Sequence, residues 1–257
     1  MKLGYPTHPR RSLLTEIDWI GRNGFDFVDL FLEPETGALG AFDAVAVREA
    51  LRSWNLPAVG HLAWYLPIGS PVKELRRAAI EVAASYFPAL ATIGISRVTI
   101  HAHWASSSLF SVEESLHWQG ETLAEMIRLA APHGLQIMYE PVGMAAESTE
   151  NLDKLLQCLP DLGFHLDIGH FHLNQRQPAD FIRHFASRLV HVHLHDNDGS
   201  RDQHLPPGIG NIDWDATLTA LKECYDGTVT LEVFTPEKDY VLLARDWVRR
   251  RWAGIVL

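Results

Sequence analysis

The strongest constraint on the fold is an eightfold alternation of short strand-type segments with longer helix-type segments. The strand-type segments are KLGYP at 2–6, FDFVDLFL at 25–32, AVGHLAW at 58–64, RVTIHAHW at 97–104, QIMYEPV at 136–142, LGFHLDIGH at 162–170, LVHVHLH at 189–195 and TVTLEVF at 228–234. Apolar residues at the three- and four-residue spacing of amphipathic helices fill 12–24, 42–55, 72–94, 112–134, 149–160, 178–188, 214–225 and 240–253. Strict alternation of this kind predicts a parallel sheet covered by helices.

The number of units predicts how this sheet closes. Eight strand–helix units within 257 residues match the size of a (β/α)₈ barrel. We therefore expect a single α/β TIM-barrel domain over residues 1–257, with strands ending near Leu32, Trp64, Trp104, Glu140, His170, His195 and Phe234. A doubly wound open sheet is the alternative, but no GxGxxG turn follows any strand-type segment.

Composition narrows the choice of partners and compartment. The 22 basic and 32 acidic residues give a net charge of −10, which disfavours a broad nucleic-acid surface but leaves local basic patches open. No apolar run reaches the roughly 18 residues of a membrane span, and the segment MKLGYPTHPRR lacks a signal core, so we expect no membrane partner. Cys158 and Cys224 lack zinc-ribbon spacing, so we expect buried free thiols in a reducing, cytoplasmic compartment.

Polar residues gather where the predicted strands end, which is where barrels of this kind carry their active sites. The strand ends supply His61, His101, Glu140, Asp167, His170, His193 and Glu232, and the loop after residue 195 adds Asp202 and His204. A carboxylate beside an apolar strand is costly unless it is paired or bound to a metal. Nitrogen and oxygen ligands without cysteine suit Mn²⁺ or Zn²⁺, and also Co²⁺ or Fe²⁺, better than Mg²⁺.

Each of these residues taken alone has a structural interpretation. A single strand histidine is more often a packed residue than a ligand, and Asp202 and His204 lie in a loop rich in proline and glycine. We assign structural roles to His103, His165, His172, His191 and His195, and surface positions to His117, His133 and His184. Nine residues meeting at one barrel rim nevertheless favour a divalent-metal site over coincidence.

These motifs resemble the xylose isomerase-like TIM-barrel superfamily, which contains sugar isomerases, sugar epimerases and endonuclease IV. The resemblance extends from GFDFVDLFLE to LEVF and is most specific in DIGH and in HLHDNDGSRDQHLPPGIGNIDW. Likeness to the epimerases implies one metal held by Glu140, Asp167, His193 and Glu232. It also implies that Glu140 and Glu232 form the acid/base pair and that His170 contacts the substrate.

Likeness to endonuclease IV implies a larger set of ligands. His61, His101 and Glu140 would hold one metal, the four epimerase-type ligands a second, and His170, Asp202 and His204 a third. The Asp202-Gln203-His204 triplet favours this set, because epimerases generally lack an Asp-x-His pair there. Two motifs depart from endonuclease IV: HAHW at 101–104 replaces His-Pro-Gly-Ser-His, and Glu140-Pro141 replaces Glu-Asn.

We favour a divalent-metal-dependent isomerase or epimerase acting on a sugar or sugar phosphate. Either Glu232 or Glu140 would remove the proton alpha to a carbonyl and the other would return it. The substrate-binding residues would be His170, His61, Arg201 and Trp104. The alternative is a two- or three-metal phosphoesterase acting on abasic DNA or a small phosphoester, and a metal-binding barrel without turnover is a third reading. The choice of sugar, the number of metals and the formation of a homo-oligomer stay open.

Overall fold

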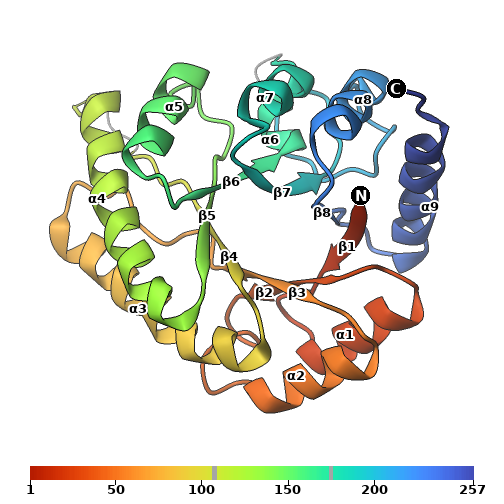
Figure 1. The fold of residues 1–257 in the computed structure, drawn as a ribbon, viewed down its shortest axis with the longest axis horizontal. Helices are drawn as coiled ribbons and strands as arrows, with labels where there is room; N and C mark the ends of the chain where they lie inside the picture. The colour runs from red at the N-terminus through yellow and green to blue at the C-terminus, as the bar shows by residue number, and fades with distance from the viewer. Residues whose placement is uncertain (106–108, 174–175) are drawn as a thin grey trace.

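The structure is a computed structural model that describes residues 1–105, 109–173 and 176–257. Eight parallel strands form a closed barrel in chain order, with β8 hydrogen-bonded to β1. The strands are β1 (Lys2–Pro6), β2 (Val28–Leu32), β3 (Ala58–Leu62), β4 (Arg97–His101), β5 (Gln136–Glu140), β6 (Gly163–Asp167), β7 (Leu189–Leu194) and β8 (Thr228–Leu231). Figure 1 shows this ring of strands surrounded by helices. The predicted (β/α)₈ barrel is confirmed, and the open-sheet alternative is wrong.

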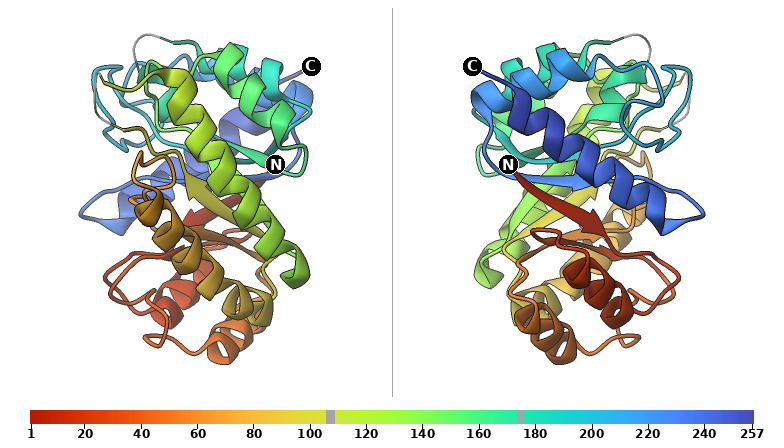
Figure 2. Two further views of the ribbon diagram at one scale, coloured as in Figure 1. Left: turned by 90° about the vertical axis from the view of Figure 1, so that its left-hand side faces the viewer. Right: turned by 90° about the vertical axis from the view of Figure 1, so that its right-hand side faces the viewer.

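The helices cover the outside of the barrel and bury their apolar faces against the strands. They are α1 (Leu13–Arg22), α2 (Ala44–Ser53), α3 (Lys73–Ile93), α4 (Val112–Ala130), α5 (Thr149–Cys158), α6 (Ile168–His172), α7 (Pro178–Phe185), α8 (Trp214–Cys224) and α9 (Lys238–Gly254), with a 3₁₀ turn, η1 (Ala131–His133), after α4. Figure 2 shows α4 and α9 slanting across opposite sides of the barrel. Among the described residues, no helix is both long and apolar enough to cross a membrane.

Several strands end earlier than the sequence predicts. The ends expected near Leu32 and Glu140 are confirmed. Those expected near Trp64, Trp104, His170, His195 and Phe234 lie at Leu62, His101, Asp167, Leu194 and Leu231, one to three residues earlier. His170 differs most from its prediction, since it belongs to the helix α6 and not to a strand. The Asp167 carboxylate accepts a hydrogen bond from the His170 backbone N–H at 2.8 Å and so caps α6 directly after β6.

The prediction that both cysteines are buried is wrong. Cys158 is exposed and Cys224 is only partly buried. Cys158 is the last residue of α5, a helix that buries Leu152, Leu155 and Leu156 on its other face. The spacing of these leucines points Cys158 away from the barrel, so its burial could not be inferred from residue type alone.

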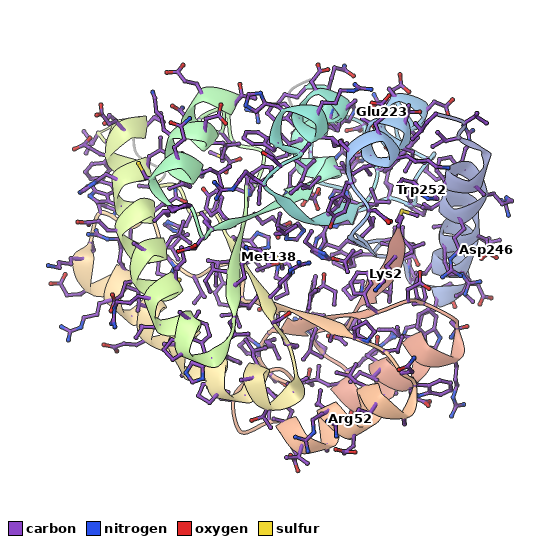
Figure 3. All side chains as sticks on the ribbon, viewed as in Figure 1. Lys2, Arg52, Met138, Glu223, Asp246 and Trp252 are labelled. Carbon is purple, nitrogen blue, oxygen red and sulfur yellow. The ribbon has the colours of Figure 1, made fainter. Side chains whose placement is uncertain are left out.

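The lower half of the barrel interior is closed by apolar side chains. Phe27, Val59 and Met138 form a small cluster separate from the main core between strands and helices. Figure 3 shows Met138 inside the ring of strands, whereas the labelled Arg52, Glu223, Asp246 and Trp252 lie outside it. Gly4 of β1 lets the Phe27 ring lie across it, since a Cβ there would be 2.4 Å from that ring. This apolar cluster fills the end of the barrel where the strands begin, so a site has room at the end where the strands finish.

The middle of the barrel is polar, in contrast with the branched apolar residues that usually fill such barrels. Asp29, Thr99, His165, His191 and Thr230 are all fully buried there. They bond to one another: Thr99 Oγ1 lies 3.0 Å from His165 Nδ1, and Thr230 Oγ1 donates to Asp29 Oδ2 at 2.9 Å. The strand-end residues therefore rest on a hydrogen-bonded layer of polar side chains.

We predict that Gly4→Ala lowers the free energy of unfolding by about 1–3 kcal/mol, because the new methyl group displaces the Phe27 ring from a fully packed floor. The matched control is Gly120→Ala in α4, where the added Cβ meets only Leu155 Cδ1 at 3.7 Å. That control should be neutral or stabilising by up to about 1 kcal/mol, since alanine favours a helix. Urea unfolding of the metal-free variants measures both changes, and equal midpoints for the two variants would contradict this packing.

Candidate active site and metal centre

The strand register brings four predicted ligands together at the upper end of the barrel. Asp167 on β6 pairs with His193 on β7, so their side chains stand side by side. Three carboxylates then approach Nδ1 of His193: Glu232 Oε2 at 2.9 Å, Glu140 Oε1 at 3.6 Å and Asp167 Oδ2 at 3.8 Å. We call Glu140, Asp167, His193 and Glu232 the main set.

The main set fits a divalent cation. Both oxygens of Glu140 and Oδ2 of Asp167 are buried and have no directed hydrogen bond to any residue that the structure describes. Burial raises the pKa of Glu140, but His101, His193 and His61 outweigh burial and lower it to about 2. The pKa of Asp167 is likewise held well below its usual range, because His170 and His195 outweigh burial. Buried carboxylates that stay ionised need positive charge beside them.

A second group, the His61 set, consists of His61, His101 and Glu140. Nε2 of His61 and Nε2 of His101 lie 2.7 Å apart, and they lie 3.5 and 3.0 Å from Glu140 Oε2. Their candidate ligand atoms fall within the spacing that one ion could bridge. Burial lowers the pKa of His61 to about 4, so this imidazole is neutral at pH 7 and its lone pair is available.

The third group, the outer set, joins His170, Asp202 and His204. Asp202 Oδ2 lies 2.9 Å from His204 Nε2 and 3.4 Å from His170 Nε2. Burial alone would lower the pKa of His204, but Glu232 and Asp202 outweigh it and raise the pKa to about 9. The same reasoning holds for His170, where Asp167 and Asp202 raise the pKa well above its usual value despite burial.

Two further residues lie among these three sets, and the sequence did not predict them there. His195, assigned a structural role, lies in the centre: its Nε2 is 3.0 Å from Asp167 Oδ1 and 3.4 Å from Asp202 Oδ1. Asp29 on β2 is fully buried, and its Oδ2 lies 2.8 Å from His193 Nε2. The available signal for Asp29 was an acid inside the apolar run FDFVDLFL, which carries the same cost as the strand-end acids.

A pocket of about 840 Å³ opens above the main set. Its lining includes Phe31, Trp64, Tyr65, Trp104 and Phe234, together with Arg10, Glu33, His61, His101, His103, His170, Asp202, His204 and Glu232. Glu232 therefore faces the pocket, whereas Glu140 is fully buried and is not part of this lining. Trp104 donates its Nε1–H to the buried Glu147 at 2.8 Å, which fixes the ring as a wall of the pocket.

The structure does not bring Arg201 to this site. Arg201 is exposed and is absent from the pocket lining, whereas His61, His170 and Trp104 are part of it. The loop after β7 bends back instead to place Asp202 and His204 inward, and the His204 backbone takes a positive φ of 47° there. Arg10, from the loop after β1, is the one arginine among the described residues that line the pocket.

Comparison with known proteins places the chain in a family. The family model described as xylose isomerase-like TIM barrel matches residues 17–251. The chain belongs to this family. An uncharacterized protein of Methanocaldococcus jannaschii is 34% identical over 131 residues, which cover 47% of this chain and 44% of that protein. The first three curated relatives are matched over 44, 59 and 62% of their lengths.

Two solved structures show the extent of the likeness in fold. A D-tagatose 3-epimerase-like protein has a TM-score of 0.88 at 24% identity, with 98% of this chain and 97% of that chain covered. The IOLI protein, whose structure contains a zinc atom, has a TM-score of 0.80 at 20% identity, with 98 and 95% covered. At these identities the comparison establishes the shared barrel.

We predict that zinc binding releases protons. The pKa of the buried His193 is raised well above its usual value, because Glu232 and Glu140 outweigh burial, so this imidazole carries a proton at pH 7 in the metal-free protein. An ion bound at Nδ1 must displace it, at about one proton per ion, and affinity should therefore rise with pH. Zinc titration calorimetry in two buffers of different ionisation enthalpy measures the release. His117→Gln, on an exposed helix face, is the control and should leave it unchanged.

Proposed function

We propose that this protein is a divalent-metal-dependent sugar isomerase or epimerase. The observation that carries the proposal is the meeting of Glu140, Asp167 and Glu232 at Nδ1 of His193, directly below an aromatic-walled pocket. The main set would hold the ion. One nitrogen and several carboxylate oxygens suit Mn²⁺ or Zn²⁺, with Co²⁺ and Fe²⁺ as further choices.

The pocket supports an uncharged sugar over a sugar phosphate. Arg10 is the single lysine or arginine in the described lining, whereas Glu33, Asp202 and Glu232 supply three carboxylates there. The protonated His170 and His204 offset part of this negative charge but are already paired with Asp202, so one exposed arginine is left to bind a phosphate dianion. Flat aromatic walls joined to a few placed polar groups are instead typical of sites for small, largely uncharged ligands.

The two glutamates are placed for different parts of the reaction. When bound, the divalent ion supplies a positive charge that polarises the substrate carbonyl. Glu232 faces the pocket and can take a proton from the carbon beside that carbonyl. Glu140 lies deeper, within 3.0 to 3.9 Å of five imidazoles, and would hold the ion. In an isomerase Glu232 would also return the proton it took, to the neighbouring carbon, whereas an epimerase would need Glu140 to begin the reaction protonated and to give its own proton from the opposite face.

His170 is oriented to bind a substrate oxygen. Its Nδ1 lies 3.0 Å from the carbonyl oxygen of Pro141, which leaves Nε2 directed at the pocket beside Asp202. The raised pKa of His170 keeps that nitrogen protonated, so it donates to an oxygen of the sugar. The names of the structural neighbours, a D-tagatose 3-epimerase-like protein and a zinc-containing IOLI protein, are consistent with sugar chemistry at a metal.

Glu232→Gln should lower kcat by at least about 100-fold on whichever sugar the wild-type protein converts, because it removes the base that faces the pocket. It should also weaken metal binding, since an amide replaces a charged ligand. Assays on a panel of unphosphorylated ketoses, followed by NMR, would identify the substrate and measure the loss. Glu237→Gln, outside the pocket lining, is the matched control. Full activity and metal content in Glu232→Gln would remove this residue from the mechanism.

The second candidate is a phosphoesterase that uses two or three metals. One observation favours it: the His61 set and the outer set are both assembled, so the full complement of nine predicted ligands converges. Neighbouring ions of this kind activate water and neutralise the charge that develops on phosphate. This candidate comes second because Arg10 is the single lysine or arginine in the described lining.

Metal count and reaction together separate the two candidates. For a sugar isomerase we expect a stoichiometry near one ion per chain, ketose turnover and no cleavage of an abasic-site duplex. Asp202→Ala should then keep its metal, because Asp202 is outside the main set. A stoichiometry near three, with strand cleavage that Asp202→Ala abolishes, reverses the ranking. Elemental analysis of protein purified without chelator, with both assays on the same sample, makes the measurement.

A further inference from the structure

Asp29 stands at the centre of the polar layer beneath the site. Its carboxylate is fully buried on β2, and its Oδ2 accepts from Thr230 Oγ1 at 2.9 Å. The same oxygen lies 2.8 Å from His193 Nε2 and 3.3 Å from His191 Nε2. Because His193 Nδ1 faces the carboxylates of the main set, one imidazole connects Asp29 to the proposed metal position.

The second oxygen of Asp29 faces the other group of ligands. Oδ1 lies 3.9 Å from His61 Nδ1, and neither atom has a hydrogen bond to a described residue. His61 Nε2, the opposite nitrogen of that ring, lies 3.5 Å from Glu140 Oε2. The arrangement is therefore repeated: two imidazoles each turn one nitrogen to Asp29 and the other to an oxygen of Glu140.

We propose that Asp29 is a positioning residue shared by His193 and His61, which fixes both rings as ligands with their lone pairs turned toward Glu140. This inference rests on the proposed metal centre. Neutral imidazole has one N–H and one lone pair, so an acceptor at one nitrogen sets which nitrogen is free to bind a cation. Carboxylates behind ligand imidazoles orient the ring and raise its basicity in this manner.

A purely structural role would account for only part of these contacts. Thr230 and His191 already supply Asp29 with donors, and His191 has its own second partner in Thr228 Oγ1 at 2.7 Å. The contact with His193 is the shortest of those that Asp29 makes, and it is made to the ring that faces three further carboxylates. The contact of Asp29 with His193 and its approach to His61 are not needed to satisfy the Asp29 carboxylate, and the positioning role accounts for both.

The main test is the zinc affinity of D29N, measured by competition with a chromophoric chelator. The amide keeps the shape but presents either an N–H or an uncharged oxygen to His193, so affinity should fall by about 10- to 100-fold. D26N makes the same change of charge at an exposed position three residues away and should bind zinc like the wild type. T230V removes one donor to Asp29 without touching a ligand and should also keep its affinity. Wild-type affinity in folded D29N overturns the proposal.

A second measurement does not depend on a variant that folds. In zinc-loaded wild-type protein labelled with ¹⁵N-histidine, long-range ¹H–¹⁵N spectra should show His193 with its proton on Nε2 and His61 with its proton on Nδ1. The opposite tautomer at His193 overturns the proposal. Neither readout depends on turnover. If zinc binding depends on Asp29 but no sugar is converted, this inference holds and the proposed function is wrong. Absence of zinc binding by the wild type rejects both.

Discussion

Three carboxylates, Asp29, Glu140 and Asp167, lie fully buried inside one barrel, and the rest of the site is arranged around them. A charge buried in this way is tolerated only when opposite charge or directed donors surround it. In this barrel, imidazole side chains surround the buried carboxylates. His193 lies between Asp29 and Glu232, and His101 and His61 flank Glu140. Histidine suits this task because it can hold a proton when no cation is bound and give it up when one binds.

The strands, and not flexible loops, position most of these groups. His61, His101, Glu140, Asp167 and His193 are strand residues, so the ladder hydrogen bonds that close the barrel also set the spacing of the ligands. The outer set differs, since its aspartate and second histidine come from the loop after β7. The part of the site held by strands therefore includes the His61 set and three residues of the main set. Glu232 directly follows β8, and its backbone N–H donates to the Leu194 carbonyl oxygen at 3.0 Å, which extends the ladder to this residue.

The sequence was sufficient for the barrel and for the acids at the strand ends, because alternation and charge beside apolar runs are local signals. For Asp29 the sequence offered only an acid inside an apolar run, and it could not give the contact with His193, which spans 164 positions and depends on two strands meeting across the barrel. The prediction that Arg201 binds substrate rested on its place in the sequence next to the proposed ligands, which says little about the direction of a loop side chain, and Arg201 is exposed. His195 was assigned to structure on residue type, whereas its ring lies between Asp167 and Asp202.

The excess negative charge of the centre can be offset either by protons on the imidazoles or by bound cations. Five carboxylates, from Asp29, Glu140, Asp167, Asp202 and Glu232, share the centre with three imidazoles whose pKa values are raised, at His170, His193 and His204. With these three protonated, the centre keeps about two negative charges, and an ion that displaces the proton of His193 would reduce this to about one. An ion at the outer set would have to evict a proton from His170 or His204, so occupancy there would depend on pH as well as on metal concentration, whereas His61 is already neutral at pH 7. Near neutral pH the protons on His170 and His204 would therefore oppose an ion at the outer set, and the protonated His170 would stay free to bind a substrate oxygen.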